Sequence, residues 1–382
     1  VREPSWALSD RVGAASPPDS AGACARDAPS LQLASRVRLT IARAGTAAHV
    51  SIKPAPAKCA RVADDDERAR RVWGKLDAIL QSYCLSDFGM VIAKRWLRRI
   101  ADPSLSEFGR LRPWVLMLLN GRLRAPPTSA WQSGCPELLP NLTAQPVWDR
   151  ALFPWLANIE ASSELIAREL LALRGQQGFQ PLRIPTWASK NAVDSTDGHG
   201  QLSHDAGDWN VFYLSLHEVA FERNRALCPR TCELLATVPR AYEHAFFSAL
   251  TPGTHIIKHH GPTNKKLRIH LPLVGVSGAR MRVADHVYEA EAGRALVFDD
   301  SFEHEAWHDG NATRIVLVFD IWHPDLSDAE VKFLAFLQSA KMRAEMAADA
   351  QQPEGESFYR LLVDSSRLLG DNDWWVDASH AN

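Results

Sequence analysis

The sequence predicts an α+β fold whose main domain is mostly β, a jelly roll (double-stranded β-helix) preceded and flanked by helices. Short runs of β-branched and aromatic residues, separated by Gly, Asn, Asp and Pro, follow one another from about residue 205 to residue 323. Before and after this region, apolar residues recur at helical spacing. Many short strands at such a density are typical of a sandwich or barrel of jelly-roll type.

The N-terminal third divides into two parts. Residues 1–62 are rich in Ala, Ser, Pro and Arg without sustained periodicity, so we expect them to be disordered or loosely ordered. Residues 63–135 are expected to form a helical region, with one helix over 64–83, a second over 87–101 and a shorter third that Pro113 breaks. A Pro-rich connector, residues 124–149, marks the expected boundary to the main domain.

The main domain is expected over residues 136–346, including its flanking helices. Its first helix is predicted over 158–175, with Gly175 as the stop. The strand-like runs that follow cover residues 209–218, 253–261, 266–274, 280–286, 294–310 and 313–323. A last helix begins after Ser327, which together with Glu330 forms a capping-box pattern. Residues 347–382 are expected to be a less ordered C-terminal tail.

Composition excludes several classes of protein. The 382 residues carry a formal net charge of −2. The chain therefore lacks the excess of positive charge that indicates nucleic-acid binding, and it would be little attracted to an anionic membrane. No apolar run reaches the roughly 18–20 residues that span a bilayer, so no transmembrane segment is expected in this chain. A soluble protein is therefore expected, with the cytoplasm favoured. Because the first residue is Val, a trimmed targeting segment stays open.

Histidines are concentrated in two of the predicted strands. The stretch 253–275 holds four, and the run "FDDSFEHEAWHDG" adds His304 and His308. Strand alternation would place His255, His259 and Gly261 on one face. Two neutral imidazoles from different strands can converge on one Fe(II), whose usual triad adds a carboxylate two residues after the first His. That position is Gly261 here, so the third protein ligand is missing.

Three motifs occur in a consistent order: "SALTPGTHIIKHHGPTNKKLRIHLPL", "VFDDSFEHEAWHDG" and "TRIVLVFDIWHPDL". Through them, residues 205–330 resemble the aspartyl/asparaginyl β-hydroxylase family of Fe(II)- and 2-oxoglutarate-dependent dioxygenases. That family also lacks the carboxylate of the triad and has Gly in its place. The resemblance implies a jelly-roll catalytic domain that uses Fe(II), 2-oxoglutarate as cosubstrate and O2.

The resemblance also implies roles for individual residues. His259 and His304 fall on the two iron ligands, with His260 as the rival of His259 if the strand register slips by one. Arg314 would pair with the far carboxylate of 2-oxoglutarate, as a planar guanidinium can do bidentately. Asp300 would orient an iron-bound water or a ligand imidazole. The expected contacts to 2-oxoglutarate are Trp209, Ser248, Arg268, His270 and Arg314.

The expected activity is hydroxylation of an unactivated C–H bond, in one reading the β-carbon of Asp or Asn residues in a protein or peptide. Hydroxylation of a small metabolite or a lipid acyl chain is the alternative. Iron without a carboxylate ligand also has room for chloride, but the resemblance argues against halogenation. A second hypothesis, from a different functional class, is a catalytically inactive jelly-roll binding protein. The animal enzyme has a longer Cys-flanked loop around Cys228 and Cys232, which puts a disulfide between these two in doubt.

Overall fold

The computed structural model describes residues 57–122, 124–182, 193–194, 201–202, 204–217, 219–351 and 374–377. All of them belong to one compact unit that begins at Ala57. Residues 1–56 lie outside the described part, so the expectation for most of segment 1–62 is not tested. The helical region and the main domain fall within this one unit, and the division between them at residues 135/136 stays a prediction.

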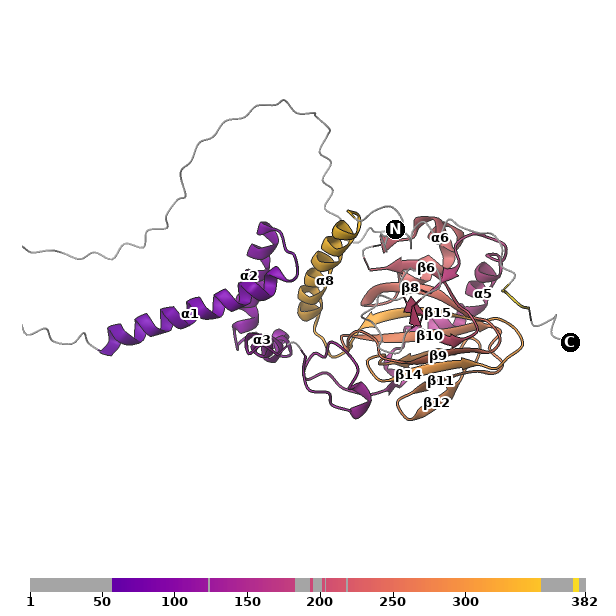
Figure 1. Cartoon of the computed structure of the whole chain (residues 1–382), viewed down its shortest axis with the longest axis horizontal. Helices are drawn as coiled ribbons and strands as arrows, with labels where there is room; N and C mark the ends of the chain where they lie inside the picture. Colours follow the sequence, from indigo (N-terminus) through magenta and orange to yellow (C-terminus); the bar gives the residue numbers. More distant parts are fainter. Residues whose placement is uncertain are drawn as a thin grey trace, which may run out of the picture. The chain divides into compact units, whose positions relative to one another are not determined.

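Four helices pack together at one end of the unit (Figure 1). They are α1 (Ala57–Gln81), α2 (Asp87–Ala101), α3 (Leu111–Leu119) and α8 (Asp328–Asp349). Their apolar faces share one core, which includes Leu80, Leu97, Trp114 and Phe333 and also takes in Trp322 from the jelly roll. This shared core joins the helices to the last strand of the β region.

The predicted capping box of α8 is confirmed and has a second function in packing. Ser327 accepts a hydrogen bond from the backbone of Glu330, and Glu330 accepts one from the backbone of Ser327. The other carboxylate oxygen of Glu330 accepts from the backbone N–H of Arg110 and Leu111, at 2.8 and 3.2 Å. The buried carboxylate therefore satisfies free donors at the start of both α3 and α8.

Two of the predicted helices differ in detail. The third helix is interrupted before Pro113, because the 3₁₀ turn Ser106–Phe108 and α3 are separate elements. Pro113 lies in the first turn of α3, where its missing N–H costs no hydrogen bond. The helix predicted over 158–175 is split at Ser162 into α4 (Leu156–Ala161) and α5 (Ser163–Leu171), so it ends before Gly175.

The strands form two antiparallel sheets that face each other, which confirms the predicted jelly roll. The major sheet follows the order β1-β13-β10-β15-β8-β6-β2, with β7 paired to β6. Its strands are β1 (Val147–Trp148), β2 (Gln180–Pro181), β6 (Trp209–Leu216), β7 (Val219–Ala220), β8 (Ala241–Leu250), β10 (Lys266–Val274), β13 (Leu296–Phe298) and β15 (Arg314–Trp322).

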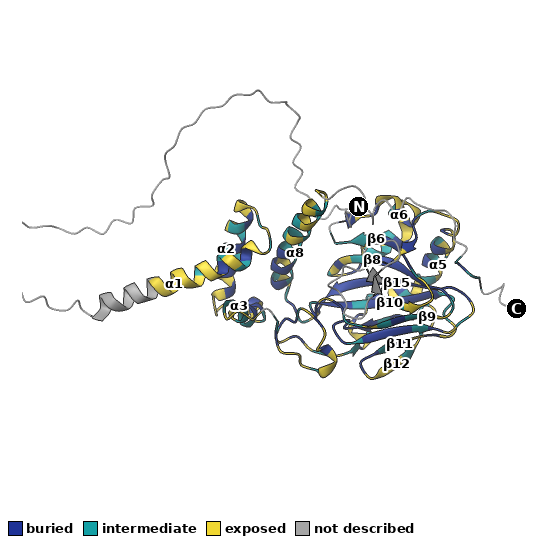
Figure 2. Cartoon of the chain, in the orientation of Figure 1, coloured by how far each residue is buried: buried dark blue, intermediate teal, exposed yellow. Residues whose placement is uncertain are grey.

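The minor sheet follows the order β12-β11-β14-β9-β5. Its strands are β5 (His204–Ala206), β9 (Thr254–His259), β11 (Ala279–Val283), β12 (His286–Glu289) and β14 (His304–His308), and β3 (Val193–Asp194) pairs separately with β4 (Gln201–Leu202). Figure 2 shows that the central strands of the major sheet are mostly buried, whereas the described part of α1 is largely exposed. The polar residues discussed below project from these buried strands into the space between the sheets.

The outer face of the major sheet is covered by helices. Side chains of α4 and α5 share a core with Leu267, Ile269 and Leu271 of β10 and with alternate residues of β15. The helices α6 (Glu222–Leu227) and α7 (Pro229–Leu235) lie beside them, and partly buried Cys232, Leu234 and Leu235 of α7 pack against this core. With one face used for this core, the opposite face of β10 and β15 is free to carry the site. Among the described residues, no helix is both long and apolar enough to cross a bilayer.

Four residues of the expected C-terminal tail, 374–377, pack against the jelly roll. Trp375 is 2% exposed and lies 5.7 Å from the ring of Phe179. The backbone N–H of Thr313 donates to Val376, and the Thr313 hydroxyl donates to Trp374 and accepts from the Val376 N–H, each at 2.9 Å. This part of the tail therefore holds the turn that precedes β15.

Replacing Trp375 with alanine is expected to destabilise the protein by about 3–5 kcal/mol, because it leaves a large cavity in the main core. Urea unfolding followed by circular dichroism measures this change. Leu227, which is 38% exposed, provides a control position where truncation to alanine should have little effect. Equal stability of the two variants would show that residues 374–377 do not contribute to the core.

Candidate metal and cosubstrate site

His259 and His304 meet between the two sheets. They are direct partners in the antiparallel pairing of β9 with β14, and their ring centroids are 4.1 Å apart. A β-bulge lies next to them, because the register shifts between His304 and Ala306, and Ile256 pairs with Ala306. Simple alternation along β9 was therefore a wrong expectation. Ile256 faces the interior with His259, whereas His255 turns to the outer face.

In both imidazole rings, Nε2 is the nitrogen that is available to a metal. Nδ1 of His259 lies 2.8 Å from the carbonyl of Ile257, and Nδ1 of His304 lies 2.8 Å from the carbonyl of Phe302. A carbonyl can only accept, so Nδ1 carries the proton in each ring and the lone pair is on Nε2. Burial lowers the pKa of His259, and burial and the neighbouring His259 hold the pKa of His304 well below its usual range. Two neutral imidazoles with available Nε2 atoms suit a divalent transition metal.

Gly261, two residues after His259, has no room for a side chain. A Cβ atom built there would lie 2.3–2.5 Å from the carboxylate of Asp300, and the Gly261 N–H donates to the Asp300 carbonyl at 2.6 Å. Within the described residues, no three His, Cys, Asp or Glu side chains are grouped in a way that could hold a metal. Both observations agree with a site that has two protein ligands.

Replacing Gly261 with alanine is expected to destabilise the fold by about 1–3 kcal/mol, because the methyl group overlaps a buried carboxylate that is held by an ion pair. Chemical denaturation gives the difference in free energy of unfolding. Gly74→Ala is the matched control, because no atom lies within 4 Å of a Cβ at this helical position. A Gly261→Ala protein as stable as the control would contradict the close approach of Asp300.

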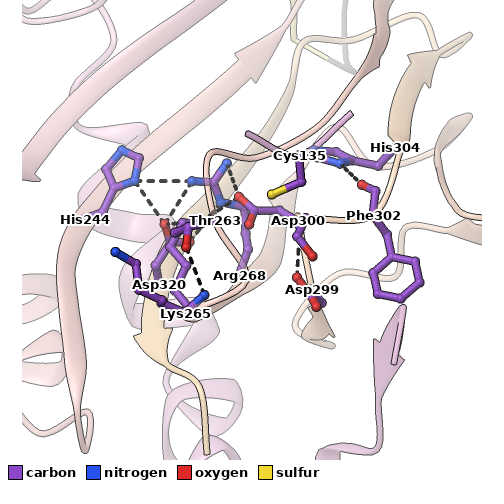
Figure 3. A network of polar contacts seen from close by, with 12 residues as sticks. Cys135, His244, Thr263, Lys265, Arg268, Asp299, Asp300, Phe302, His304 and Asp320 are labelled. Atoms are coloured by element: carbon purple, nitrogen blue, oxygen red, sulfur yellow. Dashed lines mark hydrogen bonds and ion pairs between the residues drawn. The ribbon is translucent and has the colours of Figure 1, made fainter. Parts of the chain in front are cut away.

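Asp300 belongs to a buried ionic network on the same side of the fold as His304 (Figure 3). Nζ of Lys266 lies 2.6 Å from Oδ2 of Asp300 and 3.0 Å from Oδ2 of Asp320. Arg268 binds Asp320 bidentately, through Nε at 2.8 Å and Nη2 at 2.9 Å, and its Nη1 lies 3.5 Å from Asp300. His244 completes the group, with Nδ1 3.0 Å from Asp320.

The charges in this network balance one another. Lys266, Asp300 and Asp320 are at most 2% exposed. Although burial raises it, the pKa of Asp320 is held well below its usual value by Arg268 and Lys266. Two cations and two carboxylates at these distances form a neutral, hydrogen-bonded cluster, as charges in a buried site require. One acceptor stays free, because Oδ1 of the buried Asp300 has no hydrogen-bond partner in the part of the chain that the structure describes.

Arg314 is a buried cation outside this cluster. It is 6% exposed, its Nε has no hydrogen-bond partner, and no acidic side chain of the described residues forms an ion pair with it. Burial alone lowers its pKa to about 9. A buried charge without a partner is costly. The described residues supply no anion that would compensate this charge.

His270 is close enough to interact electrostatically with both Arg314 and His304. Burial and the charges of Arg314 and Arg268 hold its pKa well below its usual range, and its ring packs edge-on against Phe298 at 5.0 Å. On the neighbouring strands, Nε1 of Trp209 donates to Oγ of the buried Ser248 at 3.0 Å. Strand β8 pairs with both β15 and β6, which aligns Arg314, Leu250 and Trp209 in one row.

The structure thus brings together most residues that the sequence singled out, and it separates the others. His255 lies on the outer face between Asp205 and Glu305, at 2.8 and 3.2 Å, and stacks on Trp307. His260 lies apart from its neighbour, with Nε2 3.2 Å from the carbonyl of Trp131. The guanidinium of Arg268 is already bidentate on Asp320. Its contact to a cosubstrate stays a prediction.

Sequence reasoning missed Lys266, Asp320 and His244 as members of the site. Lys266 is an even number of residues from Arg268, and so is Asp320 from Arg314, so each pair of side chains lies on the same face of its strand. That alternation was the available signal. His244 was missed because strand β8, which carries both His244 and Ser248 between β6 and β15, was not predicted. Cys228 and Cys232 are both free thiols in the structure.

Comparisons with known proteins identify relatives of this region. Residues 160–324 match the family model described as aspartyl/asparaginyl beta-hydroxylase. The human aspartate beta-hydroxylase domain-containing protein 2 is 39% identical over 143 residues, which are 35% of this chain and 39% of that protein. The human aspartyl/asparaginyl beta-hydroxylase is 38% identical over 138 residues, which are 34% of this chain and 18% of that protein.

A bacterial relative matches over a longer segment. The ornithine lipid ester-linked acyl 2-hydroxylase of Rhizobium tropici is 34% identical over 203 residues, which are 52% of this chain and 68% of that protein. The chain thus spans less than half of the two human proteins and about two thirds of the bacterial one.

Proposed function

Because this chain belongs to the aspartyl/asparaginyl β-hydroxylase family, we propose that it is an Fe(II)- and 2-oxoglutarate-dependent dioxygenase that hydroxylates an unactivated C–H bond. The main support for this proposal is the environment of Arg314. This buried guanidinium without an acidic partner lies in the same space between the sheets as two neutral imidazoles whose Nε2 atoms are available. A metal ligand pair beside an unfilled anion site suits a metal together with a carboxylate cosubstrate.

Each residue has a definite part in this proposal. His259 and His304 would hold Fe(II) through Nε2, and Arg314 would bind the far carboxylate of 2-oxoglutarate. Ser248 and Trp209, which already share a hydrogen bond, and the neutral His270 would line the cosubstrate on either side. When bound, Fe(II) and 2-oxoglutarate supply the oxidising chemistry, in which O2 and the cosubstrate yield succinate, CO2 and a hydroxylated product.

The ionic cluster would support this site from one side. The Oδ1 atom of Asp300 can accept a hydrogen bond and has no partner among the described residues, whereas Oδ2 is held by Lys266 at 2.6 Å. Asp300 could therefore orient a water molecule beside the metal without itself being a ligand. Arg268 and Lys266 are paired with carboxylates, so these two cations line one side of the site while the cluster as a whole adds little net charge.

Two substrate classes follow from the relatives. One named relative is an aspartyl/asparaginyl β-hydroxylase, another contains an aspartate β-hydroxylase domain, and a third is a lipid acyl 2-hydroxylase. For this chain we propose either the β-carbon of an Asp or Asn residue or an acyl or small-molecule C–H bond. The longer match to the lipid hydroxylase is the reason to include lipids in the first panel tested.

The test is conversion of 2-oxoglutarate labelled at C5 to succinate by the Fe(II)-loaded protein. Peptides with Asp or Asn, free amino acids and hydroxyl-free acyl lipids are each added in turn. We expect conversion that depends on O2 and increases with one of these classes. A binding protein that keeps only the fold would show no conversion with any of them, and its His259→Ala variant would bind Fe(II) and 2-oxoglutarate like the wild type.

A further inference from the structure

The segment that was expected to be a connector crosses the loops of both metal ligands. We call residues 124–142 the strap. It closes on itself, because the Ala125 N–H donates to Leu138 at 3.0 Å and the Arg124 guanidinium donates to the carbonyls of Gln132 and Ser133 at 2.8 and 2.9 Å. Its residues Gln132, Cys135, Leu138, Leu139 and Leu142 are buried.

One set of strap contacts reaches the loop that follows His259. The Glu137 N–H donates to Pro262 at 3.2 Å. The buried amide of Asn264 exchanges two hydrogen bonds with the backbone of Leu139, at 2.7 and 3.0 Å. Gly134 approaches so closely that a Cβ there would lie 2.4 Å from the ring of His260.

A second set reaches the loop that precedes His304. The side-chain amide of Gln132 donates to Oγ of Ser301 at 2.9 Å, and both residues are at most 2% exposed. The Glu303 N–H donates to the carbonyl of Trp131 at 2.7 Å. That same carbonyl lies 3.2 Å from Nε2 of His260, so one strap carbonyl contacts both loops.

We propose that the strap positions His259 and His304 relative to each other, with Gln132 and Gly134 as its positioning residues. A metal site with three protein ligands is held together by the third ligand, and Gly261 removes that ligand here. The two ligand strands also pair irregularly, because their register shifts between His304 and Ala306. The strap adds further cross-connections between the two loops, beside the direct bond from the Gly261 N–H to the Asp300 carbonyl. This inference rests on the metal site of the proposed function.

The test is calorimetric titration of Mn(II) into the full chain without cosubstrate. Gly134→Ala places a methyl group against the His260 ring and should push the strap away from the loop. We expect its dissociation constant for Mn(II) to rise about tenfold, the range seen when partners outside the ligand sphere are lost. His260→Ala alone removes one strap contact and should weaken binding much less than Gly134→Ala does, because the other strap bonds remain. The double variant Gly134→Ala/His260→Ala removes the clash and should recover most of the affinity that Gly134→Ala loses.

Gln132→Leu is the second variant, because it removes the bond to Ser301 at similar volume and should also weaken Mn(II) binding. Gly74→Ala controls for the change of glycine to alanine. Thermal unfolding of the metal-free proteins separates a general loss of stability from a loss of affinity. The proposal is overturned if folded Gly134→Ala and Gln132→Leu bind Mn(II) like the wild type, or if removing His260 brings no recovery. Absence of Mn(II) binding in the wild type would instead refute the proposed function as well.

Discussion

Replacing Arg314 with leucine is expected to weaken 2-oxoglutarate binding about 100-fold or more, because the cosubstrate loses the partner of its far carboxylate in a buried site. The same change should raise the thermal stability of the cosubstrate-free protein. Arg314 is buried without an acidic partner among the described residues, and burial lowers its pKa to about 9, so its charge opposes folding while the site is empty of anions.

Titration calorimetry with 2-oxoglutarate and differential scanning calorimetry of the free protein measure the two effects. Arg314→Lys is the matched control. It keeps the charge but loses the bidentate geometry, so its affinity should fall between the other two proteins. A leucine variant that is less stable than the wild type, or that binds 2-oxoglutarate equally well, would show that Arg314 has a structural partner instead.

Replacing either His259 or His304 with alanine is expected to abolish metal binding at one site per chain. With two protein ligands, losing one leaves a single imidazole. Loss of a partner outside the ligand sphere weakens metal affinity about 10–100-fold. Loss of a ligand should weaken it more than that. Titration with Mn(II) or Fe(II) under anaerobic conditions measures it.

His260→Ala and His255→Ala are the controls for this pair. Nε2 of His260 points to the carbonyl of Trp131, and His255 lies on the outer face between two carboxylates, so loss of either should not abolish metal binding. Loss of metal in His260→Ala with retention in His259→Ala would mean that the strand register is shifted by one residue.

The jelly roll was predictable because its strands carry their own signals. Residues 266–274 were predicted and observed as one strand, and the predicted run 313–323 coincides with β15 to within one residue at each end. The capping box at Ser327 and Glu330 was also readable, because both partners lie within one turn of the chain. Local patterns of this kind need no knowledge of the rest of the fold.

Long-range features were not predictable in the same way. The bulge next to His304 reverses the side-chain alternation of β9, and its position depends on the partner strand. The ionic cluster of Lys266, Asp300 and Asp320 joins residues more than 30 positions apart. Strand β8 begins with Ala241 and contains few β-branched residues, so its place in the centre of the sheet follows from packing rather than propensity.

The strap illustrates the same limit for loops. Its Pro-rich composition is typical of a linker, and composition alone contains no record of what a segment packs against. Its buried residues and its bonds to Ser301 and Asn264 show instead that it belongs to the interior of the jelly-roll unit.

The central claim is that His259, His304 and Arg314 together hold Fe(II) and 2-oxoglutarate in one site. Anaerobic titration of the Fe(II)-loaded protein with 2-oxoglutarate tests it, because chelation of Fe(II) by a 2-oxo acid produces a visible charge-transfer band. We expect a band that saturates at one cosubstrate per chain in the wild type, requires far more cosubstrate in Arg314→Leu and is absent in His304→Ala. A wild type without the band, or a His304→Ala variant with an unchanged band, would contradict it.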